Sequence, residues 1–292
     1  MKRIVSLFFL VFLAISQLFA QEPASSLLWE ISGNGLKAPS YLFGTSHIMC
    51  KEDFTITSIL KSSLLSTKQF YGELKMDDPA MQMQMMKEMM LKGKTLESLM
   101  TPDDYKKVNI AFQKITGTPI TMFNQFKPFM SLSVLYLAMA TCSEKVQPET
   151  EFMNIAKEAK LPILGLETVA DQMKAIDKLP LDSQVYELKK MVLNFDSLKA
   201  EMQGMTDVYK SRNIDSIYNF IITSGSGSGS GLGQDMEKDL IITRNNNWLP
   251  LIKEAITANP TFFAVGAGHL GGKTGVVNLL RTQGYKVTPV KF

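Results

Sequence analysis

Short apolar runs bounded by glycine, proline or polar turn residues alternate with longer segments of helical periodicity along this chain. This pattern is typical of strands that alternate with helices. Strands are predicted at residues 27–31, 40–43, 69–74, 161–166, 261–265 and 285–290, and the Ser-Gly-Asn-Gly at 32–35 predicts a hairpin turn. Helices are predicted at 55–67, 152–160 and 274–283. The sequence therefore predicts an α/β (α+β) fold with a compact mixed sheet.

The middle of the chain, about residues 76–160, is more helical and holds a methionine-rich segment. Eight of the 19 methionines lie between Met76 and Met100, and those at 81, 85 and 89 share one helical face. Thioethers bind copper(I), but methionine also forms helices and fills irregular gaps in a core. We favour a core helix or a flexible helix that contacts substrate over a copper site for residues 81–90.

Two further segments bear on domain organisation. Lys2 and Arg3 precede an apolar stretch from Ile4 to about Ala20, which predicts an exported bacterial protein whose signal peptide is cleaved near Ala20. We expect residues 21–292 to form one domain in the periplasm or outside the cell, without a membrane span. The Gly/Ser-rich run at 224–233 predicts a flexible loop. Oligomeric state is left open.

Charge and cysteine content exclude some partners and leave others open. The chain has 31 basic and 28 acidic residues, so removal of Lys2 and Arg3 would leave a nearly neutral protein, and no nucleic-acid partner is expected. The two cysteines, Cys50 and Cys142, could form a disulfide in an oxidising compartment, but their spacing cannot decide it.

The two histidines, His47 and His269, each follow a strand-like run and have glycine three residues before them, at Gly44 and Gly266. Glycine at these positions and at Gly268 would permit close approach to a bound group. Open α/β sheets bind ligands at the carboxyl ends of strands, so neighbouring strands would bring the histidines into one site.

Acidic and basic side chains could complete that site. Glu73, expected at the end of an adjacent strand, would complete a His-His-Glu set, which is a known catalytic zinc arrangement. Glu167 is either a second carboxylate or a neighbour of a helix N-cap, and Arg244 either binds substrate or lies on a helix surface. A purely structural role for both histidines remains the alternative, because the chain has no HExxH motif.

Six motifs resemble the TraB/GumN family, whose wider group includes the animal Tiki proteases. The match spans most of the chain after the predicted signal peptide and rests on residues 41–47, 71–74, 127–128, 164–168, 244–248 and 265–273. The resemblance implies an α/β domain with a helical middle and one site built from the two GxxH motifs and acidic residues. In this resemblance His47 and His269 match the GxxH histidines, Glu73 matches the acidic strand position, and Arg244 matches the arginine of the late helix. The animal Tiki proteins are metal-dependent proteases, and we therefore expect His47, Glu73 and His269 to hold a divalent ion.

The leading hypothesis is an exported, peptidase-like hydrolase that depends on a divalent ion (Mn, Co or Zn) and acts on a peptide or protein substrate. In this hypothesis His47, Glu73, His269 and Arg244 are catalytic, and Glu167 supports them. One alternative is a metal-free esterase-like hydrolase in which His47 is a general base. Another is a non-catalytic protein that binds haem, copper or a peptide, and a third is a structural protein.

Overall fold

The computed structural model describes residues 25–140, 142–227 and 237–292. The predicted signal peptide and its cleavage site lie outside these ranges. Within them, no helix has the length and apolar character needed to cross a membrane.

A six-stranded mixed sheet has the order β6-β4-β7-β2-β1-β8, which confirms the predicted sheet. Strands β6, β4, β7 and β2 are parallel, whereas β1 is antiparallel to both of its neighbours. The central strand β7 is buried over Thr261–Val265, as its continuous apolar sequence requires. The strand bounds are β1 Leu28–Ser32, β2 Ser40–Thr45, β4 Gln69–Gly72, β6 Ile163–Gly165, β7 Thr261–Gly266 and β8 Lys286–Val290.

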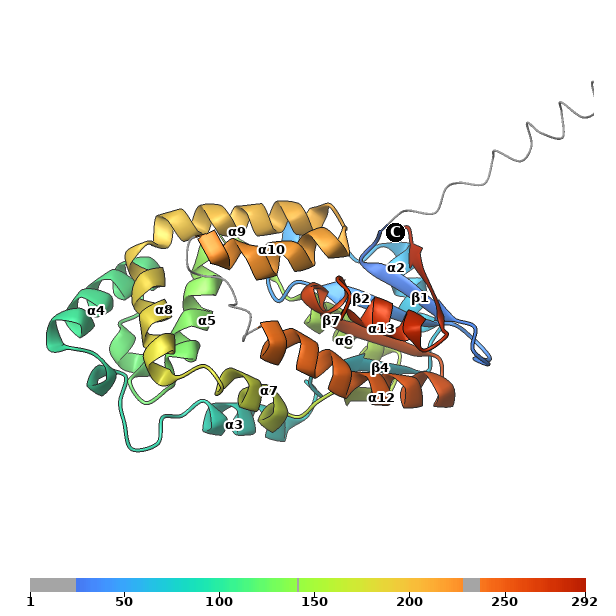
Figure 1. The fold of residues 1–292 in the computed structure, drawn as a ribbon, viewed down its shortest axis with the longest axis horizontal. Coiled ribbons are helices and arrows are strands. Elements are labelled where there is room, and N and C mark those ends of the chain that lie inside the picture. The colour runs from blue at the N-terminus through green and yellow to red at the C-terminus, as the bar shows by residue number, and fades with distance from the viewer. Residues whose placement is uncertain (1–24, 141, 228–236) are drawn as a thin grey trace, which may run out of the picture.

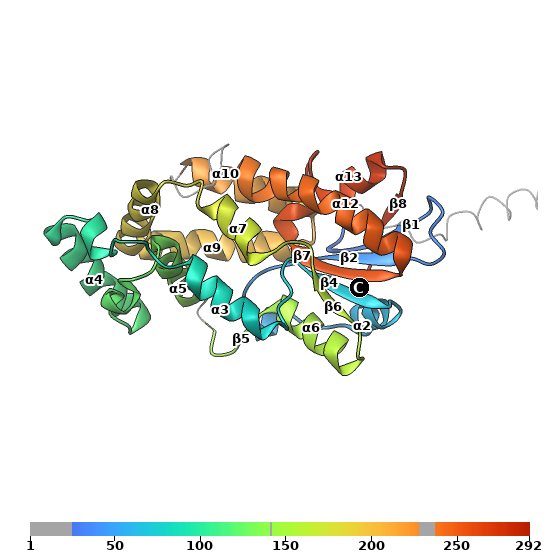
Figure 2. The same cartoon turned by 90° about the horizontal axis from the view of Figure 1, so that it is seen from below.

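Helices cover both faces of this sheet (Figures 1 and 2). Helices α2 (Ser58–Leu65) and α6 (Pro148–Glu158) lie on one face, and α12 (Thr243–Ala258) and α13 (Val276–Thr282) lie on the other. Large side chains that are almost fully buried fill the space between the layers: Phe43, Phe152, Trp248, Phe262 and Phe263. A short π-helical segment, Lys238–Ile242, leads into α12, which continues through Pro250.

A helical region extends away from the carboxyl edge of the parallel strands (Figure 1). Helices α4, α5 and α8 enclose a second core around Val108, Phe112, Leu135 and Leu188. Helix α9 runs from this region toward the sheet, and α10 returns alongside it in the opposite direction. The helix bounds are α3 Pro79–Glu88, α4 Pro102–Thr116, α5 Pro128–Met139, α7 Val169–Ile176, α8 Leu181–Leu193, α9 Phe195–Lys210 and α10 Ile214–Gly227. The helical region therefore extends well beyond residue 160 in the sequence and includes helices that follow β6.

Local differences from the sequence predictions have simple causes. Helix α2 begins at Ser58 because the side chain of Thr57 accepts the N–H of Leu60 and caps the helix there. The first four residues of the Gly/Ser run, 224–227, continue α10, and the rest of that run lies outside the described residues. Met81 and Met85 are partly buried against a small core that contains buried Met89, whereas Met83 is exposed, so this face of α3 packs toward the protein.

The two cysteines are paired. Cys50 and Cys142 form a disulfide with a Cα–Cα distance of 5.7 Å. Strand β3 (Met49–Cys50) also pairs antiparallel with β5 (Lys145–Val146). The disulfide and this two-residue ladder fix the segment before α6 beside the segment after β2.

Candidate active site

Three neighbouring parallel strands place the predicted catalytic side chains at one edge of the sheet. Glu73 directly follows β4, His269 ends the short 3-10 turn after β7, and His47 lies two residues beyond β2. The strands are adjacent in the order β4-β7-β2, so residues that are distant in sequence converge. A Cβ atom added at Gly266 would lie 3.2 Å from Glu73 Oε1, 3.6 Å from His269 Cδ2 and 3.9 Å from His47 Cε1. Glycine at 266 therefore leaves the space in which the three side chains meet.

Glu73 is buried and held from several sides, with 10% of its side chain exposed. Its Oε1 accepts the N–H of Gly266 at 2.8 Å, and its Oε2 accepts from Arg244 Nη2 at 2.5 Å and from Gln172 Nε2 at 3.3 Å. Burial opposes ionisation of this carboxyl, but Arg244, the two histidines and the Gly266 N–H outweigh it and lower its pKa to about 2. Glu73 is therefore a carboxylate at neutral pH.

His269 is buried with its ring orientation fixed. The Asn245 Nδ2 group donates to the carbonyls of His269 and Thr274, so Asn245 Oδ1 faces the ring and accepts from Nδ1 at 2.7 Å. The ring also packs against Trp248, with centroids 4.4 Å apart. Burial lowers the pKa of His269 to about 3. The imidazole is therefore neutral, with the proton on Nδ1 and the lone pair of Nε2 directed at the site.

Arg244 links these residues, and all five of its N–H donors are engaged. Its Nε donates to Glu167, its Nη1 to the Leu240 carbonyl at 3.0 Å and to His269 Nε2 at 3.0 Å, and its Nη2 to Glu73 and Glu167. With 11% of its side chain exposed, Arg244 joins the site residues to one another in this structure and has no donor left for a substrate.

Glu167 is part of the same buried network. Besides Arg244, its carboxylate accepts from Trp248 Nε1 at 3.1 Å and Gln172 Nε2 at 3.2 Å. Burial raises the pKa of Glu167, although the bonds from Arg244 and Trp248 oppose this shift. Thr168 is the N-cap of α7, so Glu167 combines both sequence interpretations: it precedes a helix cap and supplies a second carboxylate.

His47 differs from His269 because 81% of its side chain is exposed. Its Nδ1 lies 3.2 Å from Oε1 of Glu149, and that oxygen also accepts from Thr45 Oγ1 at 2.6 Å. The hydrogen bond with Glu149 raises the pKa of His47, and the exposure of the ring limits this shift through solvent screening. Glu149 thus orients the imidazole.

Sequence reasoning missed Glu149. Met49 pairs with Val146 and Cys50 with Lys145, so continuing this antiparallel register sets the residues around 148 opposite His47. The Cys50–Cys142 pairing, had it been known, would have indicated an acid after residue 145 as a partner for the histidine. Gln172 and Asn245 were also missed as site residues, because nothing local marks a hydrogen-bonding amide.

The other two glycines have packing roles. A Cβ at Gly44 would lie 3.1 Å from Ala267 Cα, and one at Gly268 would lie 2.7 Å from Ile221 Cδ1. Close approach of protein atoms therefore accounts for Gly44 and Gly268, whereas Gly266 alone of the three borders the candidate catalytic side chains.

The chemical types of the candidate ligands are suitable for a divalent metal ion. One buried imidazole with its Nδ1 proton held by an amide, one exposed imidazole held by a carboxylate, and one ionised carboxylate are the ligands and outer contacts that such ions use. The ligand atoms of His47, Glu73 and His269 are not all within 4.8 Å of one another, and Arg244 occupies the lone pair of His269 Nε2. An ion would need Arg244 Nη1 to release that nitrogen. Among the described residues, the one group that meets this distance limit contains Cys50, whose sulfur is in the disulfide.

A family model described as TraB/PrgY/gumN matches residues 27–289, a span that contains every residue of this site. The chain belongs to the TraB/PrgY/gumN family. Curated relatives of this family member include the metalloprotease TIKI2 of Danio rerio, which is 23% identical over 92% of the chain and 61% of the relative. The metalloprotease TIKI1 of Homo sapiens is 24% identical over 91% of the chain and 62% of the relative.

The chain thus spans about three-fifths of the length of these relatives. No solved structure is significantly similar to it. The comparisons establish the family and a similarity to metalloproteases.

Proposed function

We propose that this protein is a metal-dependent hydrolase of the peptidase type, exported to the periplasm or the cell exterior. The observation that carries the proposal is the convergence of His47, Glu73 and His269 around Gly266, at the carboxyl edge of three adjacent strands. The similarity to the TIKI metalloproteases supports the same class of chemistry. A peptide or protein is the substrate that this class implies.

In this proposal His47, Glu73 and His269 hold the ion, and Mn, Co and Zn are the candidates. A divalent ion in such a site lowers the pKa of a bound water and polarises a carbonyl. Neighbouring residues of the protein hold the two imidazoles in the states that such an ion requires. Asn245 keeps the Nε2 of His269 unprotonated, and Glu149 orients His47. Glu167 balances the charge of Arg244, which we propose exchanges one of its present bonds to orient substrate.

The test is metal-dependent thermal stability of the wild type beside His47→Ala and His269→Ala. An ion at a hundredfold excess over its Kd stabilises the folded state by about 2.7 kcal/mol, which is readily measured. We expect one of the three ions to raise the Tm of the wild type and neither variant to respond. If no ion shifts the Tm and replacing both histidines leaves hydrolysis unchanged, the proposal is wrong.

The contact between His47 and Glu149 favours a second candidate, a metal-free hydrolase of the esterase type. An exposed imidazole paired with a carboxylate can accept a proton from water. Hydrolysis that survives chelation and is lost in His47→Ala would select this alternative. Hydrolysis that chelation abolishes and one ion restores would select the metal-dependent enzyme.

A further inference from the structure

Two cavities flank the loop that carries His47. The smaller, of about 200 Å³, is lined by His47, Glu73 and Glu149 together with apolar side chains. The larger, of about 360 Å³, is lined by Ser46 and Ile48, the residues on either side of His47. The loop Ser46-His47-Ile48 therefore borders both cavities.

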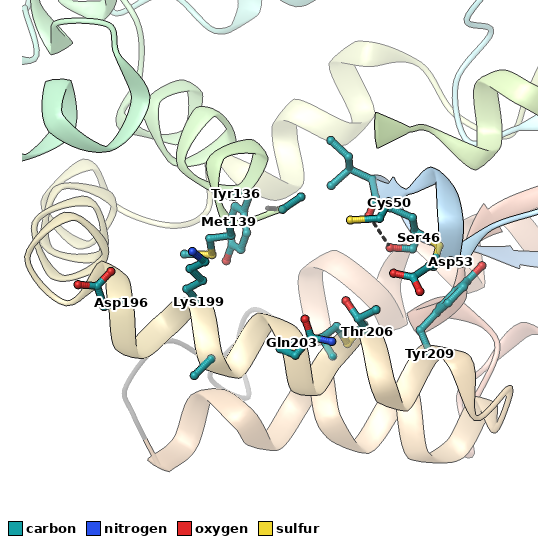
Figure 3. Close-up of a pocket in the computed structure, with 15 residues that line it drawn as sticks. Ser46, Cys50, Asp53, Tyr136, Met139, Asp196, Lys199, Gln203, Thr206 and Tyr209 are labelled. Carbon is teal, nitrogen blue, oxygen red and sulfur yellow. Dashed lines mark hydrogen bonds between the residues drawn. The ribbon is translucent and has the colours of Figure 1, made fainter. Parts of the chain in front are cut away.

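One face of α9 forms a wall of the larger cavity, as Figure 3 shows. Asp196, Ala200, Gln203 and Thr206 line it and recur at helical spacing, and Tyr209 follows at the end near the sheet. The hydroxyl of Tyr209 donates to the carbonyl of Gly44 at 2.9 Å. The lining stripe of α9 therefore leads directly to the first GxxH motif.

The length and chemistry of this stripe suit an extended polypeptide. Thirteen residue steps from Asp196 to Tyr209 span about 20 Å, the length of about six extended residues. Met205 of α9 and Met139 of α5 add apolar surface to the amide, hydroxyl and charged groups that line the cavity, and Lys199 offsets the charge of Asp196. A surface with mixed polarity and both charge signs suits peptide groups and varied side chains better than a phosphate-rich ligand.

The smaller cavity suits a single apolar side chain. Phe70, Leu74, Met153 and Ile163 line it, with Gln147 and Thr150 among its polar groups. Its volume is below the ~300–1,000 Å³ of sites that hold a whole small-molecule ligand. A peptide residue whose side chain entered this cavity would bring its neighbouring peptide bond toward His47 and Glu73.

We propose that the two cavities are halves of one cleft that holds an extended polypeptide across the Ser46-His47-Ile48 loop. The α9 stripe binds several residues on one side, and the smaller cavity takes an apolar side chain of the size of leucine or methionine on the other. This inference rests on the proposed function for its chemistry, but the binding of peptide can be measured without turnover.

The first test fills the larger half. Ala200, exposed in the middle of the stripe, is changed to Trp, and exposed Ala258 at the end of α12 is changed to Trp as the matched control. A randomised octapeptide library is captured on immobilised protein in chelator and read by mass spectrometry. We expect Ala200→Trp to reduce capture at least tenfold and Ala258→Trp to leave it unchanged. Equal capture by the two variants, or none by the wild type, would overturn the cleft.

Cleavage of the same peptides in the presence of the activating ion tests the cleft and the proposed function separately. We expect Ala200→Trp to lower kcat/KM for octapeptides at least tenfold and for tetrapeptides less than twofold, because short peptides need only the end nearest His47. If Ala200→Trp and Ala258→Trp cleave peptides of every length equally well, the hydrolase proposal stands and the cleft proposal is wrong. Absence of cleavage with selective loss of octapeptide capture keeps the cleft and rejects the hydrolase.

The second test enlarges the smaller half. Met153→Ala removes most of one lining side chain, and Met100→Ala, at a partly buried position in the helical region, is its control. We expect the residue preferred beside the cleaved bond to change from Leu or Met to Phe or Tyr by at least fivefold in Met153→Ala only. An unchanged preference would contradict the assignment of this cavity to a substrate side chain.

Discussion

At the scale of single residues, the site is a buried network of opposite charges centred on Arg244. Two carboxylates, Glu73 and Glu167, share one guanidinium, and that guanidinium also occupies the lone pair of His269. Because each of these groups is buried, removing one leaves an unpaired charge or lone pair that is costly in the protein interior. A ligand that displaced one of these contacts would therefore also change the stability of the protein.

We expect Arg244→Met to lower the free energy of unfolding of the metal-free protein by about 3–5 kcal/mol, because it leaves two buried carboxylates without their cation. A divalent ion should then raise the Tm more than it does in the wild type, since Nε2 of His269 is free to bind it. Thermal denaturation with chelator and with each ion measures both effects. Exposed Arg212→Met is the control, and an equal metal shift in Arg244→Met and wild type would contradict the coupling.

The buried imidazole predicts a pH dependence of stability. The pKa of His269 is about 3 in the folded state against an ordinary 6.5, so the unfolded chain takes up a proton that the folded chain does not. The free energy of unfolding should therefore fall as pH decreases from 6.5 toward 3, by about 1.4 kcal/mol per pH unit. Glu73, with a pKa of about 2, adds to this loss below about 4.5.

Urea unfolding in chelator between about pH 7 and about pH 5 checks this dependence. We expect His269→Gln to remove the slope and His47→Gln to keep it, because the raised pKa of His47 has the opposite sign: its contribution is present below 6.5 and lost as pH rises. A wild type whose stability is flat across this range would refute the assignment of a buried neutral His269.

At the scale of elements, the disulfide and the β3–β5 pair align two segments that each contribute to the site. They place the start of α6, which carries Glu149, beside the end of β2, which leads to His47. A covalent link that closes a loop of this length stabilises mainly by restricting the unfolded chain. Here it also sets the distance between the imidazole and its carboxylate.

We expect the double variant Cys50→Ser, Cys142→Ser to lose about 2–4 kcal/mol of unfolding free energy. Hydrolysis measured well below the Tm should fall by a factor similar to that of Glu149→Gln, because both changes disturb the orientation of His47. Exposed Glu158→Gln on the same helix is the control. Full activity in the folded double variant would show that the ladder alone positions Glu149.

At the scale of the whole molecule, the two larger hydrophobic cores of the described residues stabilise different parts of the protein. The sheet and its covering helices hold the candidate catalytic residues, whereas the second core lies in the helical region of α4, α5 and α8. Helices α9 and α10 connect the two regions, and α9 supplies the wall of the proposed cleft (Figures 1 and 3).

We expect Phe112→Ala, a change at the centre of the second core, to cost about 3–5 kcal/mol of local stability. Hydrogen exchange should accelerate in α4, α5 and α8 more than in β2, β4 and β7, and the metal-dependent shift in Tm should remain. Uniform acceleration across both regions would show that the two cores unfold as one unit.

Local sequence patterns are sufficient to predict the strands, the mixed sheet and the position of Glu73 beside the two GxxH motifs. These features are carried by local signals: apolar runs of strand length, turn residues, and polar side chains that directly follow strands. The register of parallel neighbours then brings such residues to one edge, so the grouping of His47, Glu73 and His269 could be expected before the structure was known.

The hydrogen-bond partners of those residues, in contrast, depend on how distant segments pack in the folded protein. Glu149 lies beside His47 because a disulfide between cysteines 92 residues apart, and the short ladder next to it, align their two segments. Asn245 contacts His269 only when α12 packs on the sheet. The bonds of Arg244 with two buried carboxylates were not predicted either, because Glu73 and Glu167 come from strands and turns far from α12 in the sequence. These hydrogen-bond and ion-pair partners depend on burial and on contacts between distant segments, and local sequence patterns encode neither.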